Sequence, residues 1–159
     1  MWTVTESPVG PLRIVARDGA VTAIEFTPFR DGDGRPRGDR DDGAAVLVEA
    51  VRQLADYFAG RRTTFDLPLA PDGTDWQRAV WDQLRAIGYG ETASYGQIAA
   101  RLGRSNAASR AVGLANGANP IPIVVPCHRV IGANGTLTGY AGGLDRKQLL
   151  LELEQDALF

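Results

Sequence analysis

Two kinds of reactive side chain are almost missing from this sequence, whose 159 residues include one cysteine and one histidine. With one cysteine the chain cannot form an internal disulfide, which suits a reducing compartment such as the cytoplasm. One cysteine and one histidine cannot make the usual four-ligand structural zinc site, so we expect neither a metal nor another cofactor. A hydrolase that pairs its cysteine with a distant histidine is also excluded, because the two residues are adjacent in sequence.

Long hydrophobic runs are missing as well. No segment approaches the ~20 apolar residues that are needed to span a bilayer. The start of the chain, Met1–Glu6, lacks the basic residues and apolar stretch of a signal peptide. We therefore expect a cytoplasmic protein that does not associate with membranes.

Acidic and basic residues nearly balance, but they are unevenly distributed. The formal net charge is −2, yet Arg85–Lys147 holds seven basic residues against two acidic ones, a net charge of +5. A basic face can hold a polyanion even on an acidic protein, because the local field steers binding. Without other evidence, this charge distribution is also typical of an ordinary solvated surface with charges of both signs.

The first half of the chain alternates between apolar and polar residues. Trp2–Glu6, Leu12–Ala16 and Val21–Phe26 have the period of strands, and Asp18-Gly19 is a turn sequence, so we predict an antiparallel meander. Helical periodicity follows over Ala44–Ala59. These elements predict an N-terminal lobe of antiparallel strands and a helix.

The connections in this half have a different composition. Arg30–Gly43 carries charges of both signs, much glycine and no apolar residue, so we predict a mobile surface loop that buries nothing. Phe65–Leu67 predicts a short edge strand before the connector Pro68–Gly73. We place the lobe boundary there and expect an α/β (α+β) fold, with an N-terminal lobe over residues 1–70 and a mostly helical C-terminal lobe over residues 71–159.

Two capping boxes, Thr74–Gln77 and Ser94–Gln97, mark helix starts in the C-terminal half. The second helix should run to about residue 102, where a glycine follows. A third helix, capped at residue 105 or 106 and ending near residue 116, carries Arg110. Two short helices around a glycine-containing turn match a helix-turn-helix, although many ordinary helix pairs have the same pattern.

The apolar segment Ile121–Pro126 precedes the cysteine and is bounded by prolines. Because proline lacks an N–H group, this segment cannot be a central strand. We predict a buried, rigid, extended segment that positions Cys127.

Cys127 is directly followed by His128 and Arg129. A lone cysteine beside an apolar run is usually a small buried hydrophobic residue, but a base and a positive charge near sulfur stabilise the nucleophilic thiolate. Neighbours in an extended chain point to opposite faces, so contact with His128 needs a water molecule or a helical turn that begins at Cys127. The histidine also needs an acceptor on its other nitrogen. Spacing does not choose among the three candidates, which are Asp145, Glu152 and Glu154.

Several motifs surround this site. The string Pro126-Cys127-His128-Arg129-Val130 follows Asn119-Pro120-Ile121-Pro122 and Arg110-Ala111-Val112-Gly113. The other motifs are Gly73-Thr74-Asp75-Trp76-Gln77, Tyr89-Gly90-Glu91-Thr92, Ser94-Tyr95-Gly96 and Gly139-Tyr140-Ala141-Gly142-Gly143. This set resembles the O6-alkylguanine-DNA alkyltransferase (methylated-DNA–protein-cysteine methyltransferase) family. The resemblance covers the C-terminal half densely and the N-terminal lobe, at Ser7–Leu12, more loosely.

The resemblance implies catalytic roles for four residues. Cys127 would accept the alkyl group, and His128 would deprotonate it through a water molecule. Glu154 would orient His128. Tyr95 would donate to the guanine ring as the leaving base gains charge.

The resemblance also implies residues that hold DNA and the base. Arg110 would fill the gap left by the flipped nucleotide, and Ser94, Tyr95 and Arg129 would contact DNA. Asn119 would be the hinge between the third helix and the cysteine segment. The base pocket would be lined by Val130, Tyr140, Ala141 and Gly142.

The implied function is DNA repair. The protein would transfer the alkyl group of O6-alkylguanine, and of O4-alkylthymine, from duplex DNA irreversibly onto Cys127 after base flipping. We expect double-stranded DNA as the partner and a monomeric protein, and leave open whether binding is cooperative. Two alternatives are a module that recognises such lesions without repairing them, in which the cysteine is typically replaced, and a helix-turn-helix regulator with a structural cysteine.

Overall fold

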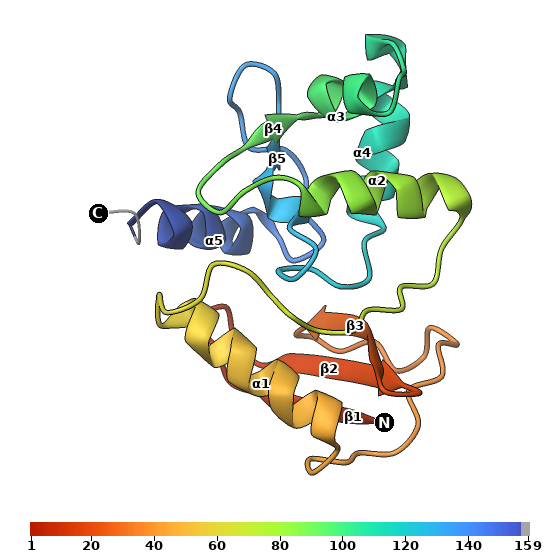
Figure 1. Ribbon diagram of the computed structural model, residues 1–159, viewed down its shortest axis with the longest axis vertical. Helices are drawn as coiled ribbons and strands as arrows, with labels where there is room; N and C mark the ends of the chain where they lie inside the picture. Colours follow the sequence, from red (N-terminus) through yellow and green to blue (C-terminus); the bar gives the residue numbers. More distant parts are fainter. Residues whose placement is uncertain (157–159) are drawn as a thin grey trace. The chain divides into compact units, whose positions relative to one another are not determined.

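The computed structural model describes residues 1–156 and divides into two compact units, Met1–Asp72 and Gly73–Phe159 (Figure 1). Strands and helices are both present, and the expected α+β class is confirmed. Within the described residues, no helix combines the length and apolar character required to cross a membrane.

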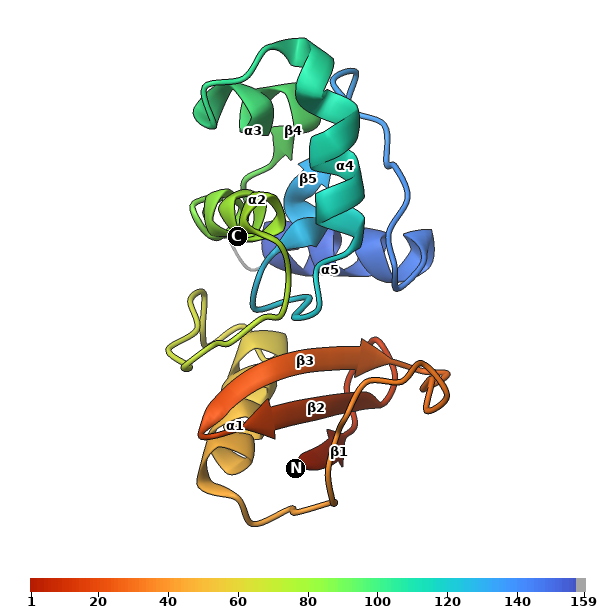
Figure 2. The same cartoon turned by 90° about the vertical axis from the view of Figure 1, so that its right-hand side faces the viewer.

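The N-terminal unit is a three-stranded antiparallel sheet with a helix against one face (Figures 1 and 2). Its elements are β1 (Trp2–Thr5), β2 (Leu12–Arg17), β3 (Ala20–Phe26) and α1 (Ala45–Phe58). Asp18 and Gly19 connect β2 to β3, and both have positive φ, at 52° and 77°. Such angles match the twist of a two-residue hairpin, so the predicted meander is confirmed. The helix buries Leu47, Leu54 and Tyr57.

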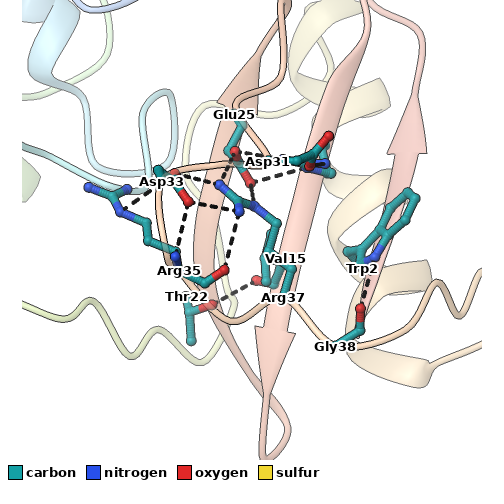
Figure 3. A network of polar contacts seen from close by, with 10 residues as sticks. Trp2, Val15, Thr22, Glu25, Asp31, Asp33, Arg35, Arg37 and Gly38 are labelled. Atoms are coloured by element: carbon teal, nitrogen blue, oxygen red, sulfur yellow. Dashed lines mark hydrogen bonds and ion pairs between the residues drawn. The ribbon is translucent and has the colours of Figure 1, made fainter.

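The charged segment after β3 differs from the predicted mobile loop. The guanidinium of Arg37 binds Glu25 of β3 at 2.8 Å and Asp33 at 2.7 Å (Figure 3). Arg13 of β2 binds the same Glu25 at 3.0 Å and Asp31 at 2.6 Å. The side chains of Arg13 and Arg37 are 5% and 9% exposed. Alternating charges let these groups be buried together, so a segment without apolar residues is still anchored to the sheet.

The predicted edge strand at Phe65–Leu67 does not form. The peptide groups of Asp66 are already used, because its N–H donates to Oε1 of Gln53 and its carbonyl accepts from Nε2, both at 2.9 Å. The chain reaches the sheet slightly later, where Leu69 forms a parallel bridge with Val21 of β3. A side chain of α1 therefore takes the hydrogen bonds that a strand would need.

The C-terminal unit is mostly helical and contains one short pair of parallel strands. Its elements are α2 (Asp75–Arg85), β4 (Ala93–Ser94), α3 (Tyr95–Arg101), the 3-10 turn η1 (Asn106–Ala108), α4 (Ser109–Gly117), the 3-10 turn η2 (Cys127–Arg129), β5 (Val130–Ile131) and α5 (Leu144–Asp156). Both capping boxes are confirmed. The hydroxyl oxygens of Thr74 and Ser94 each accept from the amide of the glutamine three residues later, at 3.1 Å. The local sequence therefore determines where α2 and α3 begin.

The predicted helix-turn-helix consists of α3, η1 and α4, which pack side by side (Figures 1 and 2). Gly103 in the turn has a φ of 72°, a conformation that glycine adopts without strain. The pair buries Ile98 of α3 and Val112 of α4.

The strand pair brings distant parts of the sequence together. Ala93 pairs with Val130 and Ser94 with Ile131. Since β4 leads directly into α3 at Tyr95 and β5 directly follows η2, the start of α3 lies beside the cysteine turn.

The segment before Cys127 is buried, as predicted, but it is turned rather than extended. The amide of Val125 donates to the Ile121 carbonyl at 2.9 Å, and Ile123 has a φ of 74°. Asn119 closes this turn, because Nδ2 donates to the Val125 carbonyl at 2.8 Å and Oδ1 accepts from the Ile121 amide at 3.0 Å. The prolines correctly exclude a central strand, but the extended conformation is wrong because an asparagine side chain stabilises a turn instead.

Candidate active site

Cys127 begins the 3-10 turn η2, and two neighbouring segments hold its backbone. Its amide donates to the Val125 carbonyl at 2.8 Å, and its carbonyl accepts from Nδ2 of Asn116 in α4 at 3.4 Å. Of the two ways in which Cys127 and His128 could cooperate, the structure contains the helical turn that begins at the cysteine.

The thiol of Cys127 is buried, with the residue 4% exposed. Burial raises the pKa of the Cys127 thiol to about 11, because the thiolate would lose its hydration. A hydrogen bond from Asn119 and the charge of Lys147 lower the pKa by smaller amounts. The neighbouring histidine and arginine thus do not give the thiolate that the sequence suggests, and Cys127 needs a base in order to react.

His128 and Glu154 form a buried pair, with 2.7 Å between Nε2 and Oε2. Arg129 binds the same carboxylate twice, from Nε at 2.8 Å and from Nη2 at 3.0 Å. Burial alone would raise the pKa of Glu154, but the hydrogen bonds from His128 and Arg129 outweigh it and lower the pKa to about 2. The structure thus brings His128 to Glu154, the last of the three carboxylates that spacing left open.

This pair determines which ring nitrogen of His128 carries the hydrogen. An ionised carboxylate can only accept, so Nε2 must be the donor. Burial lowers the pKa of His128 and outweighs the opposing effect of Glu154, so the ring is neutral near pH 7. Nδ1 is then unprotonated, and it has no hydrogen-bond partner among the described residues. His128 therefore presents a buried proton acceptor one residue from the thiol.

Arg129 has a different place from the one predicted. It is 6% exposed, and besides its two bonds to Glu154 its Nη1 donates to the Ile87 carbonyl at 2.7 Å. Each of the three guanidinium nitrogens therefore donates to a group inside the protein, so few N–H donors remain for a DNA phosphate. We therefore assign Arg129 to the buried ion pair rather than to DNA contact.

The helix-turn-helix residues lie at helix starts. Ser94 is the N-cap of α3, and its hydroxyl oxygen accepts from the amide of Gln97 at 3.1 Å, which leaves its hydrogen for another acceptor. Tyr95 is the first residue of α3 and is half-buried. Arg110 lies in the first turn of α4 and is exposed. Of these three, Arg110 is the charge that remains available to a polyanion.

The predicted pocket residues lie on β5 and on the segment before α5. Val130 is buried and pairs with Ala93. Tyr140 and Gly142 are half-buried, whereas Ala141 is exposed. Tyr140 also lowers the pKa of the Cys127 thiol through a hydrogen bond, so the segment approaches the sulfur.

Three residues with contacts in this region are absent from the prediction. Asn116 contacts the Cys127 carbonyl at 3.4 Å, Lys147 is completely buried, and Thr138 hydrogen-bonds to the hydroxyl of Tyr95. Asparagine is a poor residue inside a helix, which is a weak signal for Asn116. Nothing in the local sequence indicates that Lys147 is buried, because that depends on carbonyls from distant segments.

Comparison with known proteins identifies relatives over nearly the whole chain. Residues 1–71 match the 6-O-methylguanine DNA methyltransferase, ribonuclease-like domain, and residues 75–156 match the 6-O-methylguanine DNA methyltransferase, DNA binding domain. A Methanosarcina acetivorans protein named methylated-DNA–protein-cysteine methyltransferase is 48% identical over 153 residues, which cover 96% of this chain and 97% of that protein.

Solved structures are similar to a comparable degree. The crystal structure of Mycobacterium tuberculosis O6-methylguanine methyltransferase is 49% identical, with a TM-score of 0.90, and the match covers 98% of this chain and 93% of that one. The structure of OGT from the same organism in complex with DNA gives the same identity, coverage and TM-score.

Proposed function

The chain belongs to the 6-O-methylguanine DNA methyltransferase family, and from this we propose that it repairs DNA by one irreversible alkyl transfer onto Cys127. Its substrate is duplex DNA that contains O6-alkylguanine, and O4-alkylthymine is a second substrate. The protein acts as a monomer in the cytoplasm and is consumed by the reaction.

Base flipping is the first step of the proposed reaction. The alkyl carbon of a stacked base cannot reach a buried sulfur, so the nucleotide must leave the helix at a cost of a few kcal/mol. Arg110, exposed on α4, fills the gap in the duplex and keeps the nucleotide out. Ser94 contacts the DNA backbone beside this gap. Asn119 is the hinge between α4 and the cysteine turn.

The chemical step is a displacement at the alkyl carbon. Nδ1 of His128 takes the thiol proton through a water molecule, and Glu154 stabilises the resulting imidazolium. The sulfur forms a bond to the carbon as the bond from carbon to O6 breaks, and that electron pair remains with the guanine. Tyr95 donates to the ring, which accepts one proton in place of the one lost by Cys127.

The base pocket supports the geometry of this displacement. Val130 and Tyr140 line the pocket, and the backbone at Ala141 and Gly142 lies against the flat base. Holding sulfur, carbon and oxygen in line supplies much of the rate increase. The thioether product has no group that water readily displaces, so Cys127 does not regenerate.

The contact between Nε2 of His128 and Glu154 carries this proposal. At 2.7 Å it assigns the hydrogen to Nε2 and leaves Nδ1 as an acceptor, next to a thiol whose pKa of about 11 demands a base. A structural cysteine has no need of such an arrangement.

The direct test is to mix the protein with a duplex that contains O6-methylguanine and to weigh it. We expect a gain of one CH2, as a methyl group replaces the thiol hydrogen, located on Cys127 by peptide mapping. Cys127→Ser should bind the same duplex and leave the methyl on the base. Binding without a mass change in the wild-type protein would favour a lesion-recognition module or a regulator instead.

A further inference from the structure

Lysine occurs once in this chain, at position 147, whereas arginine occurs sixteen times. This single lysine is completely buried, with an exposure of 0%. Lysine is almost never fully buried unless its ammonium group is paired, because the loss of hydration is costly. The proposed reaction gives Lys147 no role, so its burial needs a specific explanation.

Lys147 joins two segments that border the base pocket. Its Nζ donates to the Val130 carbonyl at 2.6 Å and to the Thr138 carbonyl at 3.3 Å. Val130 begins β5 directly after the cysteine turn, and Thr138 lies two residues before Tyr140. The ammonium group on α5 thus links the strand that follows the cysteine turn to the segment that precedes Tyr140.

Thr138 in turn contacts Tyr95. Its Oγ1 shares a hydrogen bond with the Tyr95 hydroxyl, in which either oxygen can be the donor. A tyrosine hydroxyl has one hydrogen and two lone pairs. When Thr138 donates to one lone pair, the hydrogen of Tyr95 is free to point toward a base.

We propose that Thr138 and Lys147 are positioning residues for alkyl transfer: Lys147 holds the backbone at Val130 and Thr138, and the Thr138 hydroxyl holds Tyr95 so that its phenol donates to the everted base. This inference rests on the proposed function. It also explains the use of lysine, because three donors on one small atom reach carbonyls of two segments, whereas the donors of a guanidinium lie in one plane.

The test is a single-turnover measurement of methyl transfer from duplex DNA. Thr138→Val removes the hydroxyl at nearly constant shape and should slow transfer about 5- to 10-fold, as expected for one lost hydrogen bond. Thr138→Ser should restore a rate close to that of the wild type. Thr136→Val is the matched control, because Thr136 is in the same segment but its hydroxyl donates to Asn134 at 2.7 Å.

A double-mutant cycle with Tyr95→Phe separates positioning from general damage. If Thr138 acts through the phenol, Thr138→Val should cost less than about twofold once the Tyr95 hydroxyl is gone. The reaction of Cys127 with iodoacetamide does not require Tyr95, and it should be unchanged in Thr138→Val. Lys147→Met should slow transfer, and it should move the iodoacetamide reaction to higher pH, because a positive charge near the thiol is lost.

The outcomes distinguish this inference from the function on which it rests. Wild-type transfer rates in Thr138→Val, or an equal loss with and without the Tyr95 hydroxyl, would overturn the positioning role and leave the alkyltransferase function intact. Failure of the wild-type protein to take up a methyl group would overturn both. Melting curves identify any variant that is unfolded, and the two Thr138 variants carry the test if Lys147→Met does not fold.

Discussion

Replacing Glu154 by glutamine tests the buried charge arrangement behind Cys127 most directly. The carboxylate accepts from His128 at 2.7 Å and from Arg129 at 2.8 and 3.0 Å. In Glu154→Gln the single amide oxygen can still accept from Arg129, so the NH2 group must face His128. Nε2 of the histidine then becomes an acceptor, the hydrogen moves to Nδ1, and the base is lost. Methyl transfer should fall by roughly 10²- to 10⁴-fold.

The same substitution should reduce stability in a defined pH range. A pKa that is lowered from 4.5 to about 2 corresponds to roughly 3 kcal/mol of stability at neutral pH. For a chain of this length that is a fall in Tm of about 6 to 12 °C. The wild-type protein loses this contribution as the pH falls from about 4.5 toward 2, whereas Glu154→Gln has none to lose. The difference in Tm should therefore shrink in acid.

The assays are single-turnover transfer at pH 7 and thermal unfolding between pH 2 and 7. Glu152→Gln is the matched control, because Glu152 is exposed on the same helix and accepts a hydrogen bond from Gln148 at 2.9 Å. A Glu154→Gln protein that transfers within about threefold of the wild-type rate would refute the argument that this carboxylate determines the hydrogen position. An equal loss in Glu152→Gln would show that the effect is general.

Four further changes have expected outcomes. Arg110→Ala should slow transfer from duplex DNA more than it weakens binding to undamaged duplex, measured by rapid quench and by titration; equal losses would argue against a wedge. Asn119→Ala removes two hydrogen bonds that close the buried turn and should lower the free energy of unfolding by about 2–3 kcal/mol, which urea denaturation measures. The iodoacetamide reaction of Cys127 should rise with pH until about pH 11, as thiolate forms, and a plateau near pH 8 would contradict the raised pKa. Arg37→Met leaves Glu25 without one of its two arginines and should increase protease cleavage within residues 30–43; an unchanged digestion pattern would mean that the ion pairs do not anchor the segment.

Features that depend on neighbouring residues were predictable from the sequence. The capping boxes at Thr74 and Ser94 place the starts of α2 and α3, because the residues that satisfy the first amides are three positions away. The Asp18-Gly19 hairpin is likewise a local property of the chain. The string around Cys127 also indicated where the chemistry lies.

Features that depend on distant partners were not predictable. The burial of Arg129 depends on its ion pair with Glu154 of α5, which lies 25 residues away in sequence. The attachment of the charged segment depends in the same way on the ion pair between Arg37 and Glu25 of β3. Lys147 is buried because two carbonyls from separate segments converge on it. In each case a polar residue has buried contacts that periodicity and composition do not record.

The two-residue pairing of β4 with β5 has a consequence for engineering. The backbones of Ala93 and Val130 are paired. Tyr95 follows β4 and the cysteine turn precedes β5, so the two cannot be moved independently of one another. A designer who wishes to admit larger adducts would therefore gain little by altering either strand. Within the proposed base pocket, the part to alter is the segment over residues 136–143, with Thr138 left in place because its hydroxyl contacts that of Tyr95.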